Sequence, residues 1–201
     1  MIEFFEDTHQ YLVDGIETPS VTSIITQLPQ FKDMYKGIPK SILKRKAEYG
    51  DKVHEMVETF GMTGNVPDYE RKSYEGIAIK RYMQLAIEND IHISSTEQTV
   101  AYYENEIPLY AGKYDMLGNI LGNKAIIDIK TTMKYESEYL SYQLTMYKLA
   151  IEQLLKEDIQ KAYCLWLPKK NLGRLIEVQF QEPKSLLEKV RHAYEKTYKR
   201  Q

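Results

Sequence analysis

The sequence predicts a single α/β domain, and three observations lead to this class. Segments with helical periodicity occur before residue 90 and again at 136–155. Segments rich in Tyr, Ile and Val follow residue 95 and are typical of strands. The chain of 201 residues can build one sizeable core, and it shows no internal repeat, low-complexity tract or linker.

Before residue 90 the chain is expected to form a hairpin followed by helices. Short apolar segments joined by Asp14-Gly15 predict the hairpin over 4–18. Helices are then expected over three segments, because Gly and Pro residues punctuate the chain between them: 19–28, 41–60 and 68–89. The last helix offers a candidate buried stripe, which consists of Ile77, Tyr82, Leu85 and Ala86.

The second half of the chain is expected to supply the sheet. Strands are predicted over five segments: 96–103, 110–117, 124–130, 162–167 and 174–180. The helix over 136–155 carries apolar side chains at spacings of three and four, namely Leu140, Leu144, Tyr147 and Ile151. A terminal helix is expected to begin near Pro183.

Three charged residues are expected to meet on one face of the hairpin over 110–130. Side chains alternate along a strand, so Asp128 and Lys130 share a face. With a turn at Gly122-Asn123, Leu117 pairs with Asp128 and Asp115 pairs with Lys130, unless a bulge at Gly118 shifts the register. The opposite face is apolar and suits a core: Met116, Ile120, Ala125, Ile127 and Ile129.

This arrangement suits metal-assisted cleavage of phosphodiester bonds. Two carboxylates on one face favour Mg²⁺ or Mn²⁺, which prefer oxygen ligands. A neighbouring Lys130 can orient the attacking water or offset charge that builds on the phosphate. The alternative interpretation is that Asp115 and Asp128 cap the hairpin and Lys130 is a surface cation, because Asp-x-Lys triplets are frequent.

Two residue pairs one helical turn apart add to the candidate site. Gln143 and Tyr147 share a helix face and can bond phosphates or base edges, although Tyr147 also suits a core. His54 and Glu58 are spaced in the same way. A neutral imidazole can complete a metal site while a carboxylate fixes its tautomer, but an isolated helical His is more often a surface or core residue.

Charge and cysteine content indicate which partners and which cellular compartment to expect. The net charge of −2 does not indicate a nucleic-acid partner, but 32–52 holds seven basic against three acidic residues, and 184–200 holds six against two, so each balances at +4. Such segments can follow a phosphate backbone or form solvated helix faces. The lone Cys164, the absence of a secretory signal and the absence of a long apolar run favour a reducing, cytoplasmic setting with no membrane contact.

The ordered motifs resemble the RecB-like branch of the PD-(D/E)xK nuclease superfamily. They are Gly50…His54…Glu58, the strand Glu97, Gly112…Asp115, Asp128-Ile129-Lys130-Thr131 and Gln143…Tyr147. The match covers about 50–147, and the N-terminal hairpin with the Pro-Ser-Val-Thr segment at 19–22 is similar to small phage-type exonucleases. Each motif is weak alone, but the ordered set is specific.

The resemblance implies a fold and roles for individual residues. It implies a restriction-endonuclease-like core with a central mixed sheet flanked by helices, divided as an extension over 1–30, a core over 50–180 and a C-terminal helix over 182–201. It implies that the metal ligands are His54, Asp115, Asp128 and the Ile129 carbonyl, and that the catalytic residues are Asp115, Asp128, Lys130 and Glu97. It implies that Gln143 and Tyr147 contact DNA and that Glu58 and Thr131 support the site.

The resemblance also implies the function and its partners. We expect a Mg²⁺- or Mn²⁺-dependent DNA exonuclease of a phage or mobile element, acting in recombination or end processing beside a recombination or single-strand annealing protein. The four cysteines that hold an iron–sulfur cluster in some relatives are missing here, so no cluster is expected. The alternatives are a DNA-binding module without turnover, a structure-specific endonuclease and a protein–protein adaptor. The sequence leaves the oligomeric state open.

Overall fold

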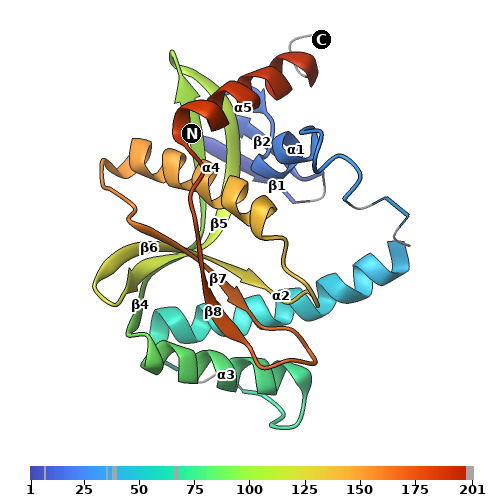
Figure 1. Cartoon of the computed structure of the whole chain (residues 1–201), viewed down its shortest axis with the longest axis vertical. Helices are drawn as coiled ribbons and strands as arrows, with labels where there is room; N and C mark the ends of the chain where they lie inside the picture. The colour runs from blue at the N-terminus through green and yellow to red at the C-terminus, as the bar shows by residue number, and fades with distance from the viewer. Residues whose placement is uncertain (7, 35, 38–39, 66–67, 198–201) are drawn as a thin grey trace.

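The computed structural model describes residues 1–6, 8–34, 36–37, 40–65 and 68–197, which form two β-sheets and five helices (Figure 1). The helices are α1 (Val21–Thr26), α2 (Lys40–Thr63), α3 (Tyr74–Glu88), α4 (Ser137–Leu155) and α5 (Pro183–Thr197). None of these described helices is both long enough and apolar enough to cross a bilayer.

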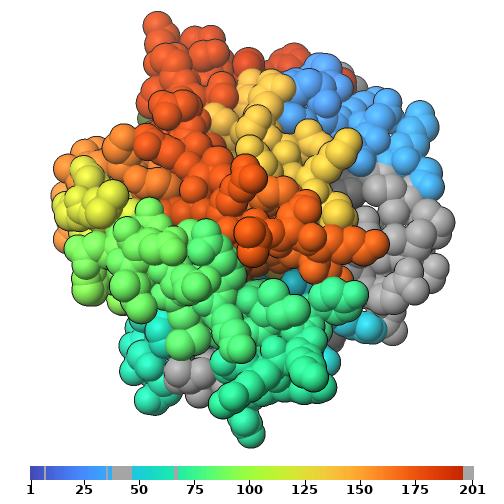
Figure 2. All heavy atoms as spheres, turned by 60° about the horizontal axis from the view of Figure 1, so that its bottom comes forward, coloured from blue at the N-terminus to red at the C-terminus, as the bar shows by residue number. Residues whose placement is uncertain are grey.

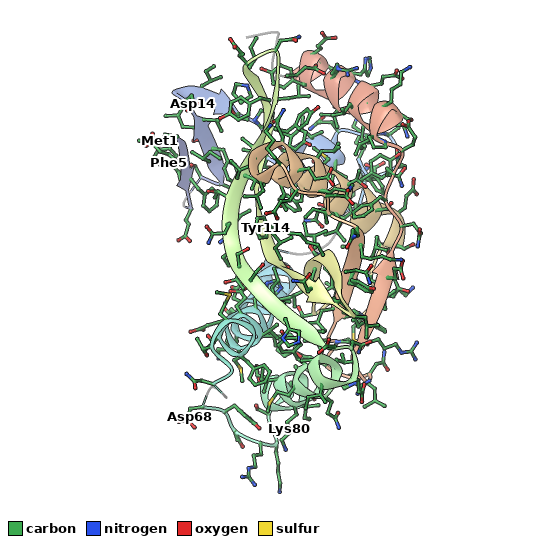
Figure 3. All side chains as sticks on the ribbon, turned by 90° about the vertical axis from the view of Figure 1, so that its left-hand side faces the viewer. Met1, Phe5, Asp14, Asp68, Lys80 and Tyr114 are labelled. Carbon is green, nitrogen blue, oxygen red and sulfur yellow. The ribbon has the colours of Figure 1, made fainter. Side chains whose placement is uncertain are left out.

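The N-terminal segment folds as a small antiparallel sheet. Its strands pair in chain order: β1 (Ile2–Phe5), β2 (Gln10–Val13) and β3 (Ile16–Thr18). The predicted hairpin therefore has a third strand, which follows the Asp14-Gly15 turn. The segment docks on the main sheet where the Ala111 amide donates to the Pro19 carbonyl at 2.9 Å. Figure 3 shows this small sheet beside the long strand that carries Tyr114.

The central sheet is mixed, which confirms the predicted α/β class. Its strands lie in chain order: β4 (Ile91–Glu104), β5 (Ile107–Ile120), β6 (Asn123–Lys130), β7 (Lys161–Trp166) and β8 (Arg174–Val178). Neighbouring strands are antiparallel except β6 and β7, which run parallel. A parallel pair needs a long crossover, and α4 supplies it.

Helices cover both faces of the sheet and create two cores. Side chains of α1, α4 and α5 pack against one face, and those of α2 and α3 pack against the other (Figure 1). The predicted stripe of α4 is confirmed, since its four side chains belong to the first core. The predicted stripe of α3 is partly wrong. Tyr82 and Leu85 are buried, but Ile77 is 51% exposed, and Ala78 and Ile79 occupy the buried face instead.

The β5–β6 hairpin differs from its predicted register by two residues. The turn lies at Leu121-Gly122, where both residues have positive φ (49° and 78°), so it is not at Gly122-Asn123. Leu117 therefore pairs with Ile126 and not with Asp128. Because a shift of two preserves the facing of every side chain, the predicted apolar face is still confirmed. All five of its members lie in the core under α2 and α3: Met116, Ile120, Ala125, Ile127 and Ile129.

A bulge lies opposite Gly118, in β4 rather than in β5. The β4–β5 register shifts by one residue between Ile93 and Ser95. A Cβ atom on Gly118 would lie 2.2 Å from the His92 carbonyl oxygen, so only glycine fits beside the bulge. Beyond it, the pairs on either side place Glu97 across from Asp115.

Candidate metal centre

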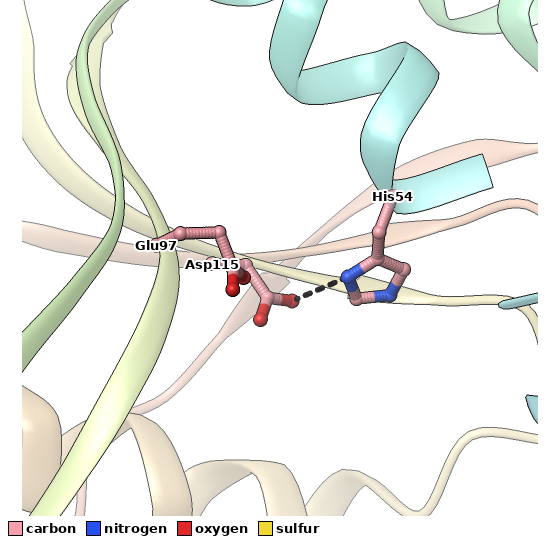
Figure 4. A group of neighbouring side chains, drawn as sticks. All are labelled: His54, Glu97 and Asp115. Carbon is pink, nitrogen blue, oxygen red and sulfur yellow. Dashed lines mark ion pairs between the residues drawn. The ribbon is translucent and has the colours of Figure 1, made fainter. Parts of the chain in front are cut away.

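Side chains from three separate elements converge at the middle of β5. His54 comes from α2, Glu97 from β4 and Asp115 from β5 (Figure 4). One ligand atom of each residue lies within 4.8 Å of the others. All three side chains are partly buried. Carboxylate oxygens and an imidazole nitrogen at this spacing can close around one small cation.

The hydrogen bond of His54 fixes which ring nitrogen is available. Its Nε2 lies 3.0 Å from the Ile129 carbonyl oxygen, which can only accept, so Nε2 carries the proton. In the neutral ring, Nδ1 then has a free lone pair, and it lies 3.8 Å from Asp115 Oδ2 and 3.8 Å from Glu58 Oε1. Burial lowers the pKa of His54 and outweighs the opposite effect of Asp128, which favours this neutral form. Nδ1 is therefore the candidate ligand.

The three charged residues predicted on the hairpin do gather. Asp115 Oδ2 accepts the Ile129 backbone N–H at 2.6 Å. Lys130 Nζ lies 2.6 Å from Asp128 Oδ2. Burial and the charge of Asp128 raise the pKa of Asp115. Burial alone would lower the pKa of Lys130, but the two carboxylates reverse this and raise it, so the ammonium stays charged.

Three buried acceptor oxygens lack a hydrogen-bond donor, and they are the only such side-chain atoms among the described residues. They are Glu58 Oε1, Asp128 Oδ2 and Gln143 Oε1. Of the three, Asp128 Oδ2 has a charged neighbour, because the Lys130 ammonium lies 2.6 Å away and pairs with it. A buried acceptor without a donor is costly. The carboxylate–imidazole set of His54, Glu97 and Asp115 therefore fits a hard divalent cation with its water shell.

The backbone at Glu97 is strained. Its φ is +52°, a left-handed conformation that is uncommon for residues other than glycine. Such conformations cost of order 1–3 kcal/mol and persist where the surroundings enforce them. The Glu97 carboxylate also pairs with Lys113. Gln98, the next residue, bonds only the Thr96 carbonyl within the described contacts, so Glu97 is the strand residue that reaches the centre.

The two candidate DNA contacts on α4 are buried. Gln143 is 9% exposed and Tyr147 is 6% exposed. The Tyr147 ring packs directly on Gly112, where an added Cβ would lie 2.7 Å from Cε1. The motif glycine thus makes room for the motif tyrosine. Burial, followed by the charge of Asp115, raises the pKa of Tyr147 well above its usual value, so the ring belongs to the core and its hydroxyl stays protonated.

Gly50, the first residue of the motifs, and Thr131, the last residue of Asp-x-Lys-Thr, also lie close together. An added Cβ on Gly50 would lie 3.3 Å from Thr131 Oγ1, so α2 approaches the end of β6 closely at this point. Sequence reasoning missed Lys113, although its position two residues before Asp115 places it on the same strand face. It also missed Asp51, which lies one turn before His54 on α2.

Two surface hollows border the centre. The larger measures about 540 Å³, and four carboxylates line it: Asp51, Glu55, Glu58 and Glu97. The smaller measures about 310 Å³ and lies beside residues 131–133. Both hollows include Asp51 and His54 in their walls. The candidate ligand His54 therefore lines both an acidic hollow and a smaller, mostly apolar hollow.

Comparisons with known proteins show the fold. No protein-family model matches this sequence, and no curated protein matches it. The crystal structure of a candidate exonuclease from Eubacterium rectale is similar, with a TM-score of 0.50 over 91% of this chain and 79% of that chain. A second structure, SSO0001, covers 81% of this chain and 88% of its own at 14% identity, but its TM-score of 0.39 carries no argument. At 9% identity, the first likeness shows a shared fold and nothing more.

Proposed function

We propose that this chain is a divalent-metal-dependent DNA nuclease of the RecB-like branch of the PD-(D/E)xK superfamily. One observation carries the proposal. His54, Glu97 and Asp115 belong to different motifs and are distant in sequence, yet their ligand atoms lie within 4.8 Å of one another. A structural role alone gives no reason to bring two partly buried carboxylates and an imidazole so close together.

The metal would be held by His54 Nδ1, Glu97 and Asp115. Asp128 and the Ile129 carbonyl are further proposed ligands, and that carbonyl keeps a lone pair beside its bond to His54. When bound, a divalent ion polarises a phosphoryl oxygen and makes a water nucleophilic near neutral pH.

The protein's own groups would position the substrate. Lys130 remains positive because its pKa is raised, so it can offset negative charge that builds on the phosphate and can orient the attacking water. Glu58 and Thr131 support this arrangement from α2 and from the end of β6. Gln143 and Tyr147, the predicted DNA contacts, are both buried, so they would support the centre from α4 without touching the substrate.

Electrostatics link metal binding to DNA binding. The centre holds four carboxylates, Glu58, Glu97, Asp115 and Asp128, against Lys113 and Lys130, so its net charge is −2 when all four are ionised and His54 is neutral. A phosphate backbone is repelled by such a charge. A divalent cation cancels it, so above the raised pKa values of Glu58 and Asp115 the metal-free protein should bind DNA weakly at this centre.

We further propose that the enzyme is an exonuclease of a phage or mobile element, which processes DNA ends for recombination in a bacterial cytoplasm. The motif order and the fold shared with the Eubacterium rectale protein support this proposal. A recombination or single-strand annealing protein is the proposed partner class.

Cleavage of end-labelled DNA tests the proposal. Linear and circular DNA are incubated with Mg²⁺ or Mn²⁺, with each end of the linear form blocked in turn, and EDTA and Asp115→Asn serve as controls. We expect metal-dependent loss of label from unblocked ends and intact circles. Cut circles would indicate an endonuclease. Metal-dependent binding without cleavage would indicate a binding module, and intact DNA with no binding would contradict the proposal.

A further inference from the structure

The smaller hollow beside the metal centre is mostly apolar. Its wall includes Ala47 and Tyr49 of α2 and the side chains of residues 131–133, with Met133 48% exposed. Among its described lining residues, Asp51 and Lys169 are the charged ones when His54 is neutral. At about 310 Å³ it lies at the lower end of the range for pockets that bind small molecules. It therefore suits one compact ligand with an apolar body.

Lys169 is held at the mouth of this hollow by two aromatic rings. Its Nζ lies 4.3 Å from the centre of the Tyr49 ring and 5.5 Å from the centre of the Tyr74 ring. Tyr49 is itself anchored, because its hydroxyl donates to the Leu167 carbonyl at 3.3 Å. Cation–π contacts of this kind fix an exposed ammonium without neutralising it. A cation that is fixed by rings beside an apolar wall, and that forms no ion pair among the described residues, is suited to an anionic ligand although Asp51 also lines the hollow.

The surroundings indicate which ligand this is. Figure 2 shows the orange β7–β8 region, which includes Lys169, packed against the green α3, beside parts of the cyan α2. The hollow shares His54 with the metal centre, whereas the larger hollow, which His54 also lines, carries four carboxylates against one lysine, Lys113. A polyanionic strand that reaches the centre is repelled on the acidic side and attracted on the Lys169 side.

We infer that the hollow between α2, residues 131–133 and the β7–β8 loop is a nucleotide subsite that holds the nucleotide next to the phosphate to be cut. The base lies against the exposed side chains of Ala47 and Met133, and Lys169 bonds the adjoining phosphate. Asp51, which also lines the hollow, can accept a hydrogen bond from a base N–H, such as the N3–H of thymine. This inference rests on the proposed function. It also names the substrate, because a base in this hollow must leave the helical stack, so a single-stranded end is the preferred form.

The protein contains a built-in reporter for this subsite. Trp166 is the single tryptophan of the chain, and its indole donates to the Thr132 carbonyl at 2.8 Å in the wall of the hollow. Titration of the full chain in EDTA with thymidine 5′-monophosphate should change Trp166 fluorescence in a saturable way. Thymidine, which lacks the phosphate, and deoxyribose 5-phosphate, which lacks the base, should each bind more weakly. Absence of any saturable change with the mononucleotide would overturn the inference.

Matched variants locate the binding. Lys169→Ala should weaken mononucleotide binding about ten-fold, because a charge-assisted hydrogen bond is worth about 1.4 kcal/mol or more. Lys170→Ala removes the neighbouring exposed lysine, which does not line the hollow, and should bind like the parent. Ala47→Phe adds a ring at an exposed helix position on the wall and should block binding. Parental binding by both Lys169→Ala and Ala47→Phe would refute the subsite.

Cleavage of single-stranded DNA separates this inference from the proposed function. Lys169→Ala should raise KM about ten-fold with kcat nearly unchanged, because it removes a contact made before the reaction as well as during it. If the protein binds the mononucleotide but does not cleave DNA, the subsite is supported and the proposed nuclease function is refuted. If the protein cleaves DNA, Lys169→Ala and Lys170→Ala have the same KM, and no mononucleotide binding is seen, then the proposed nuclease function stands and the subsite is refuted.

Discussion

The side chains of the candidate metal centre carry charges that the metal-free fold disfavours. Burial, followed by the charge of Glu97, raises the pKa of Glu58 to about 7. The pKa of Asp115 is raised for similar reasons, with Asp128 as the neighbouring charge. A carboxyl whose pKa is raised on folding destabilises the folded state when it ionises. These residues therefore reduce stability unless a cation compensates them.

Replacing Glu58 by Gln should remove part of this penalty. Between the usual pKa of 4.5 and the raised pKa of about 7, the folded protein binds more protons at Glu58 than the unfolded chain does. Its contribution to stability is therefore lost as pH rises through this window. In EDTA, Glu58→Gln should exceed the parent in unfolding free energy by roughly 1–3 kcal/mol at about pH 8 and match it at about pH 4. Urea titrations at both pH values measure this, and parallel pH profiles would count against it.

Lys130 is expected to serve the reaction and not to hold the metal. Lys130→Met keeps the length of the side chain and removes its charge. Cleavage should fall by about 10²–10³, the usual effect of losing one group that stabilises transition-state charge. Calorimetric titration with Mn²⁺ should still show binding, whereas Asp115→Asn should lose both binding and cleavage. Loss of Mn²⁺ binding in Lys130→Met would remove the distinction between the two roles.

Among the elements, β4 decides whether a third ligand reaches the centre. Before the bulge, Ile93 pairs with Gly118, and after it, Ser95 pairs with Leu117. Without this shift, Thr96 would lie across from Asp115, and Glu97 would point to the other face of the sheet. The bulge thus brings the Glu97 carboxylate to the side where Asp115 lies.

Gly118→Ala tests this role of the bulge. The added Cβ would meet the His92 backbone carbonyl oxygen at 2.2 Å, and a backbone atom cannot move aside as a flexible side chain can. We expect a loss of about 1–3 kcal/mol in unfolding free energy and weaker Mn²⁺ binding. Gly50→Ala is the matched control, because its Cβ would meet only a hydroxyl at 3.3 Å and alanine favours a helix. Equal stability of the two variants would contradict the account.

The sequence predicted the strands and the facing of Asp115, Asp128 and Lys130, because these depend on local alternation. It failed at the turn, where Leu121 adopts a positive φ that its residue type does not favour. The predicted β5–β6 register was wrong by two residues, and because this number is even, each side chain still points to the predicted face of the sheet. The bulge could not be predicted, since it depends on how β4 and β5 pair. Lys169 was missed for the same reason, because its two rings come from helices distant in sequence.

The metal centre connects the two cores of the protein. His54 and Glu58 belong to α2, whose apolar side chains pack in the core shared with α3. Gln143 belongs to α4, on the opposite face of the sheet. Asp115 lies in the strand between them. A cation bound here would join both layers, so its binding should stabilise the entire fold and not one segment.

Thermal unfolding should therefore respond to metal. At about 100 times its Kd, a ligand that binds only the folded state adds about 2.7 kcal/mol. For a domain of this size that corresponds to a rise in Tm of roughly 5–10 °C. Mn²⁺ should produce a rise of this order in the parent protein and none in Asp115→Asn, as measured by circular dichroism in a single transition. Equal rises in both proteins would place the ion elsewhere.

Anomalous diffraction from a crystal soaked in Mn²⁺ would locate the bound ion. We expect one strong anomalous peak within coordinating distance of His54 Nδ1 and of the Glu97 and Asp115 carboxylates. We expect no such peak in crystals of Asp115→Asn. A well-ordered crystal with Mn²⁺ bound at other sites and no peak between these three side chains would contradict the proposed metal centre.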